Sequence, residues 1–447
     1  MTRLFGTDGV RGEANSVITA EFSLALAVAG AEVLTDGDRP THAGTAILAR
    51  DPRASGEFIS AAIAAGIAST GVDVLDIGVV PTPTLAHLTA TMDVDFGVMV
   101  SASHNPMPDN GIKFFDSNGH KLTDEVEDEI EKALGQPRSR PTGANVGRIT
   151  REPHLVGSYL DHMVATIPHR LDGLKIVVDC AHGAASAVGP AALRSAGAEV
   201  IVTAADPDGL NINDGVGSTH LGPLQQAVVE HKADAGVAFD GDADRCLAVD
   251  ELGQIVDGDQ ILGILALAFQ AQGNLTDDTF VATKMSNLGL LRAMDEAGIN
   301  VVTTDVGDRY VLQEMARHGY NLGGEQSGHV LFTDFSTTGD GVLTALQLLG
   351  NLASSKISLS QMAGGIPRMP QVMINVADVK KEKTYTDSGL LGALLRAEES
   401  LAKTGRILLR PSGTENLVRV MVEAEDQATA QHWAEELARE VRERLGN

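Results

Sequence analysis

Three aspartates at alternate positions form the densest group of chemically reactive side chains in this 447-residue chain. Asp240, Asp242 and Asp244 follow the apolar run 235–239, which has the pattern of a buried strand. Carboxylates this close repel one another unless a cation lies among them. Oxygen ligands suit a hard ion such as Mg2+ better than zinc. We therefore expect a metal site at the carboxyl end of a strand, where open α/β sheets place their sites.

Two other interpretations of the aspartates need weighing. An EF-hand would use Glu251, which falls at loop position 12 counted from Asp240. That loop also needs glycine at position 6, where Arg245 stands, and the flanking residues favour strands over helices. A solvated acidic turn without a metal is the simpler alternative.

A serine follows another apolar run, 96–100, within Ser101-Ala102-Ser103-His104-Asn105-Pro106. Asn105-Pro106 favours a turn, so we expect Ser103 to be exposed there. An acyl-transfer nucleophile would need a G-x-S-x-G elbow, which this segment lacks. A phosphorylated serine fits better, because its oxygens would add anionic ligands to the metal. A plain turn without chemistry is the alternative.

Lys113 is the basic residue closest in sequence to Ser103 on a predicted strand that opens at Asn110-Gly111. We expect Lys113 and Arg245 to help neutralise the negative charge of the phosphorylated serine. The alternative is that Lys113 is an ordinary solvated lysine.

Two further loops carry polar groups that suit a phosphorylated sugar. Residues 323–329 read Gly-Gly-Glu-Gln-Ser-Gly-His, and a loop that mixes such groups suits sugar hydroxyls. Residues 410–415 bridge two predicted strands, and backbone N–H groups there can form an anion nest. Arg410 and Arg419 add donors that match a phosphate. A plain loop and a plain hairpin are the alternatives.

Composition limits the partners. The net charge is −26 and the sequence pI is about 4.8, which disfavours nucleic acid and anionic membranes as partners. An anionic substrate must then be held by a local basic cluster.

The two cysteines, Cys180 and Cys246, are expected to be reduced core thiols, which fits the cytoplasm, and the amino terminus lacks the apolar core of a signal peptide. The apolar stretch 22–31 is too short for a membrane span.

Alternation of short apolar runs with amphipathic stretches predicts three α/β regions. We expect an α/β fold of four domains, with boundaries at 1–152, 153–256, 257–368 and 369–447, the last being an α+β domain. Predicted strands span 45–49, 72–77, 96–100, 175–179, 199–203, 234–239, 280–283, 301–304, 371–376, 406–410 and 417–423, and predicted helices span 55–70, 184–196, 288–297, 310–318, 390–403 and 426–445.

These motifs, together with Thr7-Asp8-Gly9-Val10-Arg11-Gly12, occur in an order that resembles the α-D-phosphohexomutase superfamily over essentially the full length. Within it, Gly324-Glu325-Gln326-Ser327-Gly328-His329 and Asp305-Val306-Gly307-Asp308-Arg309-Tyr310 are most similar to its glucosamine branch. Two departures, Asn416 in place of a usual proline and Met107-Pro108 in place of a commoner aromatic-containing pair, concern loop geometry only.

The resemblance implies four domains around a central cleft, three of them with a related mixed α/β core. It implies interconversion of glucosamine 6-phosphate and glucosamine 1-phosphate through phosphorylated Ser103 and a glucosamine 1,6-bisphosphate intermediate, which supplies UDP-N-acetylglucosamine for cell-wall synthesis. Asp240, Asp242 and Asp244 would hold one Mg2+ with the phosphate on Ser103. Substrate-binding residues would be Arg11, Glu325, Ser327, Arg410, Ser412, Gly413, Thr414 and Arg419. Lys113, His104 and His329 remain alternatives for the general base.

Three other functions stay open at this point. A phosphomannomutase or phosphoglucomutase is the alternative within the same superfamily, although these relatives usually carry a different residue where Gln326 stands. A metal-dependent phosphatase would let water intercept the phosphoserine. A non-catalytic phosphosugar-binding protein is disfavoured, because Ser103 and the aspartates are all present. The sequence leaves a homodimer open.

Overall fold

The computed structural model describes residues 3–6, 8–35, 44–136, 139–402, 404–412 and 416–446. The chain forms two compact units, which are described separately here. The first contains residues 1–284 and 299–364, and the second contains 285–298 and 365–447.

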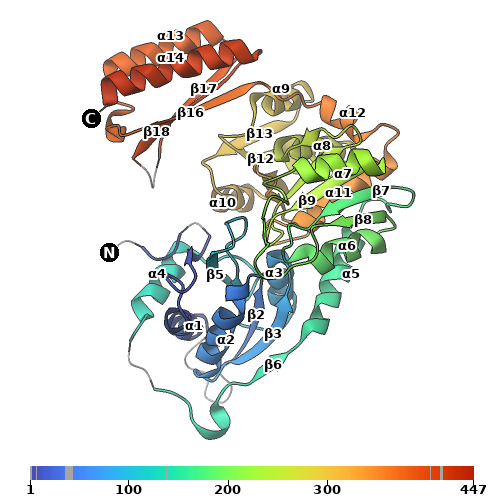
Figure 1. Cartoon of the computed structure of the whole chain (residues 1–447), viewed down its shortest axis with the longest axis vertical. Helices are drawn as coiled ribbons and strands as arrows, with labels where there is room; N and C mark the ends of the chain where they lie inside the picture. Colours follow the sequence, from blue (N-terminus) through green and yellow to red (C-terminus); the bar gives the residue numbers. More distant parts are fainter. Residues whose placement is uncertain are drawn as a thin grey trace. The chain divides into compact units, whose positions relative to one another are not determined.

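The first unit begins with a six-stranded mixed sheet (Figure 1). Its strands lie in the order β1-β5-β4-β2-β3-β6, where they are β1 (Val10–Glu13), β2 (Thr45–Arg50), β3 (Asp73–Val79), β4 (Phe96–Val100), β5 (Asp109–Asp116) and β6 (Ile149–Arg151). β2, β3, β4 and β6 are parallel, whereas β5 runs antiparallel to β4 and β1. One face packs against α1 (Ala20–Leu34), α2 (Ala54–Ala68) and α4 (Asp124–Ala133), and the other against α3 (Thr82–Thr91). Because helices cover both faces, β4 is buried throughout and reads as a continuous apolar run.

α5 (Val156–Thr166) leads into a five-stranded sheet with the order β11-β10-β9-β7-β8. The strands are β7 (Lys175–Asp179), β8 (Glu199–Thr203), β9 (Ala235–Phe239), β10 (Cys246–Asp250) and β11 (Ile255–Val256), and the helices are α6 (Ala185–Ser195) and α7 (Gly222–His231). β9 and β10 are antiparallel neighbours, so residues 240–245 form the tight connection between them.

The third sheet has the order β13-β12-β14-β15. Its strands are β12 (Thr279–Thr283), β13 (Asn300–Thr304), β14 (Leu322–Gly324) and β15 (Val330–Phe332), and the helices of this region are α8 (Gly258–Ala271), α10 (Asp308–His318), α11 (Gly341–Ser354) and α12 (Leu359–Gly364). Asp257 caps α8 by accepting a hydrogen bond from the Gln260 backbone, and Asp340 caps α11. The hairpin between β14 and β15 carries residues 325–329.

The second unit contains an antiparallel three-stranded sheet, β16-β18-β17, formed by β16 (Gln371–Ala377), β17 (Arg406–Pro411) and β18 (Leu417–Glu423). Its helices are α9 (Leu288–Glu296), α13 (Ser388–Leu401) and α14 (Gln427–Leu445). α13 and α14 pack together on one face of the sheet through a core that includes Leu390, Leu437 and Val420 (Figure 1).

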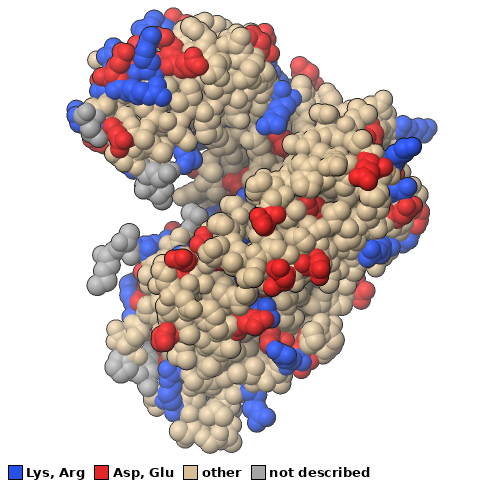
Figure 2. All heavy atoms as spheres, viewed as in Figure 1, with Lys and Arg blue, Asp and Glu red and all other residues tan. Residues whose placement is uncertain are grey.

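The predicted α/β class with a C-terminal α+β domain is therefore confirmed, and each predicted element lies within a few residues of its observed bounds. Cys180 and Cys246 are free and buried, as expected. None of the described helices is long and apolar enough to cross a membrane. On the face that Figure 2 shows, lysines and arginines are interspersed with the carboxylates, so the excess negative charge does not gather in one patch there.

Candidate active site

The serine loop, residues 101–108, connects β4 to β5 and turns the chain back on itself. The prediction that Ser103 is exposed is wrong, because only 1% of its surface is accessible. Its hydroxyl donates a 2.6 Å hydrogen bond to Asp240 Oδ2, so the turn is covered by the aspartates of the next sheet. The loop packs so closely that a side chain at Gly241 would lie 2.5 Å from the Ser103 carbonyl oxygen. The Ser103 backbone is in the left-handed region (φ 52°). This conformation costs a non-glycine residue free energy, and such strained residues cluster at functional sites.

A fully buried arginine at the start of α2 holds the serine loop in this shape. Arg53 uses all five of its side-chain N–H groups, which donate to Asp51 Oδ2 and to the carbonyl oxygens of Ser103, Asn105, Pro106 and Asp109 at 2.6–3.0 Å. Burial raises the pKa of Asp51, and Arg53 partly offsets this effect. Sequence reasoning missed Arg53, although its place just after a buried strand was a usable signal.

Asp240, Asp242 and Asp244 project from the turn between β9 and β10, at the carboxyl end of β9 as predicted. One oxygen from each carboxylate lies within 4.8 Å of the other two. All three side chains are buried, which contradicts the solvated-turn alternative. Glu251 instead accepts hydrogen bonds from Ser360, so it does not complete an EF-hand loop.

The electrostatics of the turn favour a bound cation. Burial, followed by the charges of Asp244 and Asp242, raises the pKa of Asp240 well above its ordinary value. Asp242 Oδ1 and Asp244 Oδ1 are buried and have no hydrogen-bond donor in the described part of the chain. Because buried carboxylate oxygens normally have a partner, these two atoms fit an oxygen-preferring divalent ion.

Lys113 lies on β5 with only 2% of its side chain exposed, which contradicts the solvated-lysine alternative. Its Nζ is 2.8 Å from Asp242 Oδ2 and 2.8 Å from Asp8 Oδ2. Burial lowers the pKa of Lys113, but the charges of Asp242 and Asp8 outweigh burial and raise it overall. Lys113 is therefore a fixed cation beside the aspartates. Arg11 pairs with Asp8 and donates a 3.3 Å hydrogen bond to Asn105 Oδ1.

The two candidate histidines differ in their surroundings. His104 Nδ1 lies 3.4 Å from Ser103 Oγ, and burial, with Arg245 and Arg11, lowers the pKa of His104. His329 Nδ1 lies 3.8 Å from Asp244 Oδ2, which outweighs burial and raises the pKa of His329. His104 is therefore the histidine whose surroundings favour a neutral imidazole.

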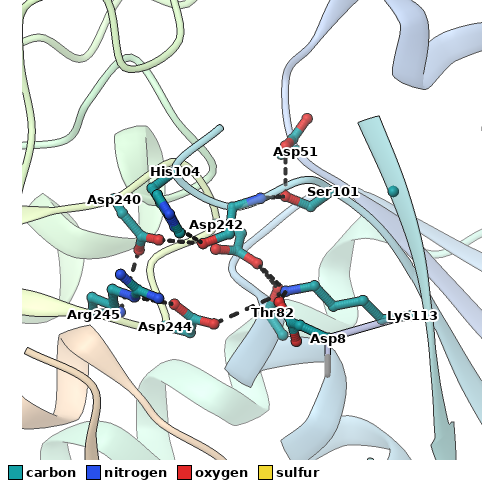
Figure 3. A network of polar contacts seen from close by, with 12 residues as sticks. Asp8, Asp51, Thr82, Ser101, His104, Lys113, Asp240, Asp242, Asp244 and Arg245 are labelled. Atoms are coloured by element: carbon teal, nitrogen blue, oxygen red, sulfur yellow. Dashed lines mark hydrogen bonds and ion pairs between the residues drawn. The ribbon is translucent and has the colours of Figure 1, made fainter. Parts of the chain in front are cut away.

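Figure 3 shows how these groups converge: the three aspartates face one another, His104 and Arg245 lie on one side, and Lys113, Thr82 and Asp8 lie on the other. Thr82 Oγ1 donates to Asp242 Oδ2 at 2.7 Å, a contact that the sequence did not suggest. Arg245 Nε is 3.8 Å from Asp244 Oδ1, and its backbone N–H donates to Asp240 Oδ1.

Residues 325–329 are fixed to the second sheet next to the aspartate turn. The Cys246 N–H donates to the Gly328 carbonyl oxygen at 3.0 Å, and a side chain at Gly328 (φ 90°) would collide with the Cys246 backbone. Glu325 Oε1 accepts the Gly307 N–H at 3.0 Å, and Ser327 Oγ lies 3.4 Å from Glu325 Oε2. The loop therefore presents a carboxylate and a hydroxyl together.

The predicted phosphate-binding residues of the C-terminal region lie in the second compact unit. Arg410 and Arg419 are direct cross-strand neighbours on β17 and β18, and like charges in such pairs repel. An anion bound between them would relieve this repulsion. Lys381 Nζ donates to the Ser412 carbonyl oxygen at 2.7 Å, a contact that sequence reasoning missed. Gly413 and Thr414 lie outside the described residues.

The fold and the site together define a class of multidomain α/β proteins with a serine opposite a carboxylate triad. Models of the phosphoglucomutase/phosphomannomutase α/β/α domains I, II and III match residues 2–140, 157–253 and 257–369, and the model of the C-terminal domain matches 373–440. The chain belongs to the phosphoglucomutase/phosphomannomutase family.

Curated relatives are similar over the whole chain. A phosphoglucosamine mutase of Paenarthrobacter aurescens is 60% identical, with 100% of this chain and 98% of the relative covered. One of Streptomyces griseus is 57% identical, with both chains fully covered. Among solved structures, a Burkholderia thailandensis member of the family has a TM-score of 0.82 at 24% identity, covering 99% of this chain and 98% of the other. An Aspergillus fumigatus N-acetylphosphoglucosamine mutase, determined with GlcNAc-6P and magnesium, has a TM-score of 0.68 at 18% identity and covers 98% and 95%.

Proposed function

We propose that this protein interconverts glucosamine 6-phosphate and glucosamine 1-phosphate through a phosphorylated Ser103 and a glucosamine 1,6-bisphosphate intermediate. The observation that carries the proposal is the 2.6 Å contact between Ser103 Oγ and Asp240 Oδ2, within a turn of three buried aspartates. The full-length similarity to curated phosphoglucosamine mutases supports glucosamine as the sugar. It also supports the role in supplying UDP-N-acetylglucosamine for cell-wall synthesis.

Asp240, Asp242 and Asp244 would hold one Mg2+ together with a phosphate oxygen on Ser103. When bound, the ion would neutralise the charge of the transferring phosphoryl group. Lys113 and Arg245 supply fixed positive charge beside the aspartates, which favours a phosphoryl group at this position against the overall charge of −26. His104 is a candidate general base, because its Nδ1 lies 3.4 Å from Ser103 Oγ and the burial that lowers its pKa favours the neutral imidazole, which has a nitrogen free to accept a proton.

In the forward direction, the sugar O1 attacks the phosphorus of phosphoserine, the bond from phosphorus to Ser103 Oγ breaks, and the O1 proton passes by way of the general base to Ser103 Oγ. The bisphosphate that forms turns over. Ser103 Oγ then attacks the phosphorus of the 6-phosphate, and the bond from that phosphorus to the sugar O6 breaks. The serine proton passes to O6, which leaves glucosamine 1-phosphate. Glu325 and Ser327 would bind sugar hydroxyls, and Arg11 would contact the substrate. Arg410, Ser412, Gly413, Thr414 and Arg419 would hold the phosphate that does not react.

We also propose domain boundaries near 152, 256 and 368, and a cytoplasmic location. The two buried free thiols support a reducing compartment.

The test compares turnover of glucosamine, mannose and glucose 6-phosphates with Mg2+, with Ser103→Ala as the inactive control. The proposal expects glucosamine 6-phosphate to have the highest kcat/KM and phosphate release to be negligible. Preference for mannose or glucose phosphate would overturn the proposed substrate. Steady release of phosphate in place of the 1-phosphate product would identify a phosphatase.

A further inference from the structure

Lys121 joins two carboxylates that are far apart in the sequence of the first compact unit. Its Nζ lies 2.6 Å from Asp8 Oδ1, next to β1, and 2.6 Å from Asp308 Oδ2, at the start of α10. The ammonium is largely buried, with 18% of the side chain exposed. Burial lowers the pKa of Lys121, but Asp308 and Asp8 outweigh burial and raise it overall, so the side chain stays cationic.

Each carboxylate that binds Lys121 also contacts a basic group of the candidate active site. Asp8 Oδ2 is 2.8 Å from Lys113 Nζ, which in turn contacts Asp242. Asp308 Oδ2 is 3.6 Å from His329 Nε2, whose other ring nitrogen faces Asp244. The contacts form a chain of alternating acidic and basic side chains, and Lys113 closes it because its Nζ also lies 4.0 Å from Asp244 Oδ2. We call this set the charge ring: Asp242, Lys113, Asp8, Lys121, Asp308, His329 and Asp244.

We infer that Lys121 is a positioning residue of the phosphoryl-transfer site, which holds Lys113 and His329 against the aspartate triad by binding Asp8 and Asp308 together. This inference rests on the proposed mutase function. If the ammonium is removed, two carboxylates that shared one cation face each other and repel. Asp8 and Asp308 would then move apart, and the basic groups they contact would move with them. Small displacements of catalytic groups cost large factors in rate.

The competing explanation is that Lys121 only stabilises the packing between the regions that contain the first and third sheets. A substitution of Arg309 distinguishes this structural role from the positioning role. The Arg309 side chain pairs with Asp124 and Glu127 across the same pair of regions. Its contact with the charge ring is through the backbone N–H, which donates to Asp308 Oδ1 and is kept in a side-chain substitution. Arg309→Gln therefore weakens this packing and leaves the ring intact. The conservative variant Lys121→Arg keeps the charge, and it has room because a cavity of about 470 Å3 borders Lys121.

The experiment measures kcat and KM for glucosamine 6-phosphate, with thermal unfolding, in the wild type, Lys121→Met, Lys121→Arg and Arg309→Gln. We expect Lys121→Met to lower kcat by about 100-fold while KM changes by less than about 3-fold. Lys121→Arg should recover most of the loss, and Arg309→Gln should keep kcat within about 2-fold of the wild type. Asp308→Asn combined with Lys121→Met should cost less than the product of the two single effects, because both break one chain of contacts.

Wild-type kcat in folded Lys121→Met would overturn the inference, and so would an equal loss of kcat in Arg309→Gln. If Lys121→Met does not fold, Asp308→Asn tests the same chain of contacts in a residue of nearly the same size, and wild-type kcat in that variant would overturn the inference. A wild-type enzyme that is inactive on glucosamine phosphates would refute the proposed function itself. If the wild type is active and substitution of Lys121 leaves kcat unchanged, only the positioning role is refuted.

Discussion

Replacing Arg53 by lysine is expected to destabilise the serine loop although the charge is kept. Arg53 is fully buried and donates five hydrogen bonds, four of them to carbonyl oxygens of residues 103–109. A lysine ammonium has three donors, so at least two of these five hydrogen bonds are lost. The carbonyl oxygens of Ser103, Asn105 and Pro106 keep a second donor, from Asn213 or from the Asp109 N–H. Each lost hydrogen bond therefore costs about 0.5–1.5 kcal/mol, which predicts a loss of about 1–3 kcal/mol in unfolding free energy. The loosened loop should also lower kcat by about 100-fold, because Ser103 is held through its own carbonyl oxygen.

The assay is urea unfolding combined with initial rates of mutase turnover at 25 °C. Arg170→Lys is the matched control, because Arg170 is largely exposed and pairs with Asp172 on the surface. That change should leave both the unfolding free energy and kcat close to their wild-type values, because an exposed ion pair contributes little to stability. If Arg53→Lys and Arg170→Lys lost equal stability, the reasoning from buried donors would be wrong. Lost stability with unchanged kcat would show that Arg53 does not position Ser103.

Three further predictions follow from the site and its surroundings. Asp242→Asn should lower kcat by several orders of magnitude and weaken Mg2+ dependence; wild-type rates at limiting Mg2+ would mean that the carboxylate is structural. Arg419→Ala should weaken binding of both sugar phosphates by about 10- to 100-fold and promote release of the bisphosphate, which measured KM values and product analysis would check. Burial, and then the neighbouring His162, lowers the pKa of His87 to about 4. The His87 imidazole binds a proton more readily in the unfolded chain than in the folded one. The stability that comes from burying the neutral imidazole is therefore complete above about pH 6.5 and is lost as the pH falls toward about 4. Between pH 7.5 and 5 the wild type should lose about 1–2 kcal/mol more than His87→Phe, after allowing for partial exposure; equal losses in urea unfolding would contradict this.

The sequence predicted the elements of this fold well, because apolar runs such as 96–100 and 235–239 are long enough and buried enough to read directly. It also placed Asp240, Asp242 and Asp244 correctly at a strand end. It misjudged the burial of Ser103, because burial there depends on a turn of the second sheet that covers the loop, and local sequence carries no sign of that contact.

Long-range polar partners were the other group that the sequence could not supply. Local sequence does not identify the acceptors that give Arg53 and Thr82 their roles, because these lie about 50 and 160 residues away. Lys121 likewise contacts carboxylates 113 and 187 residues away. Residue type and spacing predict local geometry, whereas partners so distant along the chain depend on how the sheets pack against one another.

The central claim is that Ser103 carries the phosphoryl group during mutase turnover. The most direct measurement is intact-mass analysis with phosphopeptide mapping of enzyme incubated with glucosamine 1,6-bisphosphate and Mg2+, followed by chase with glucosamine 6-phosphate. We predict one phosphoryl group on Ser103, transferred to sugar during the chase, and none on Ser103→Ala. Active enzyme that carries the group only on Ser101, or on no serine, would contradict the account.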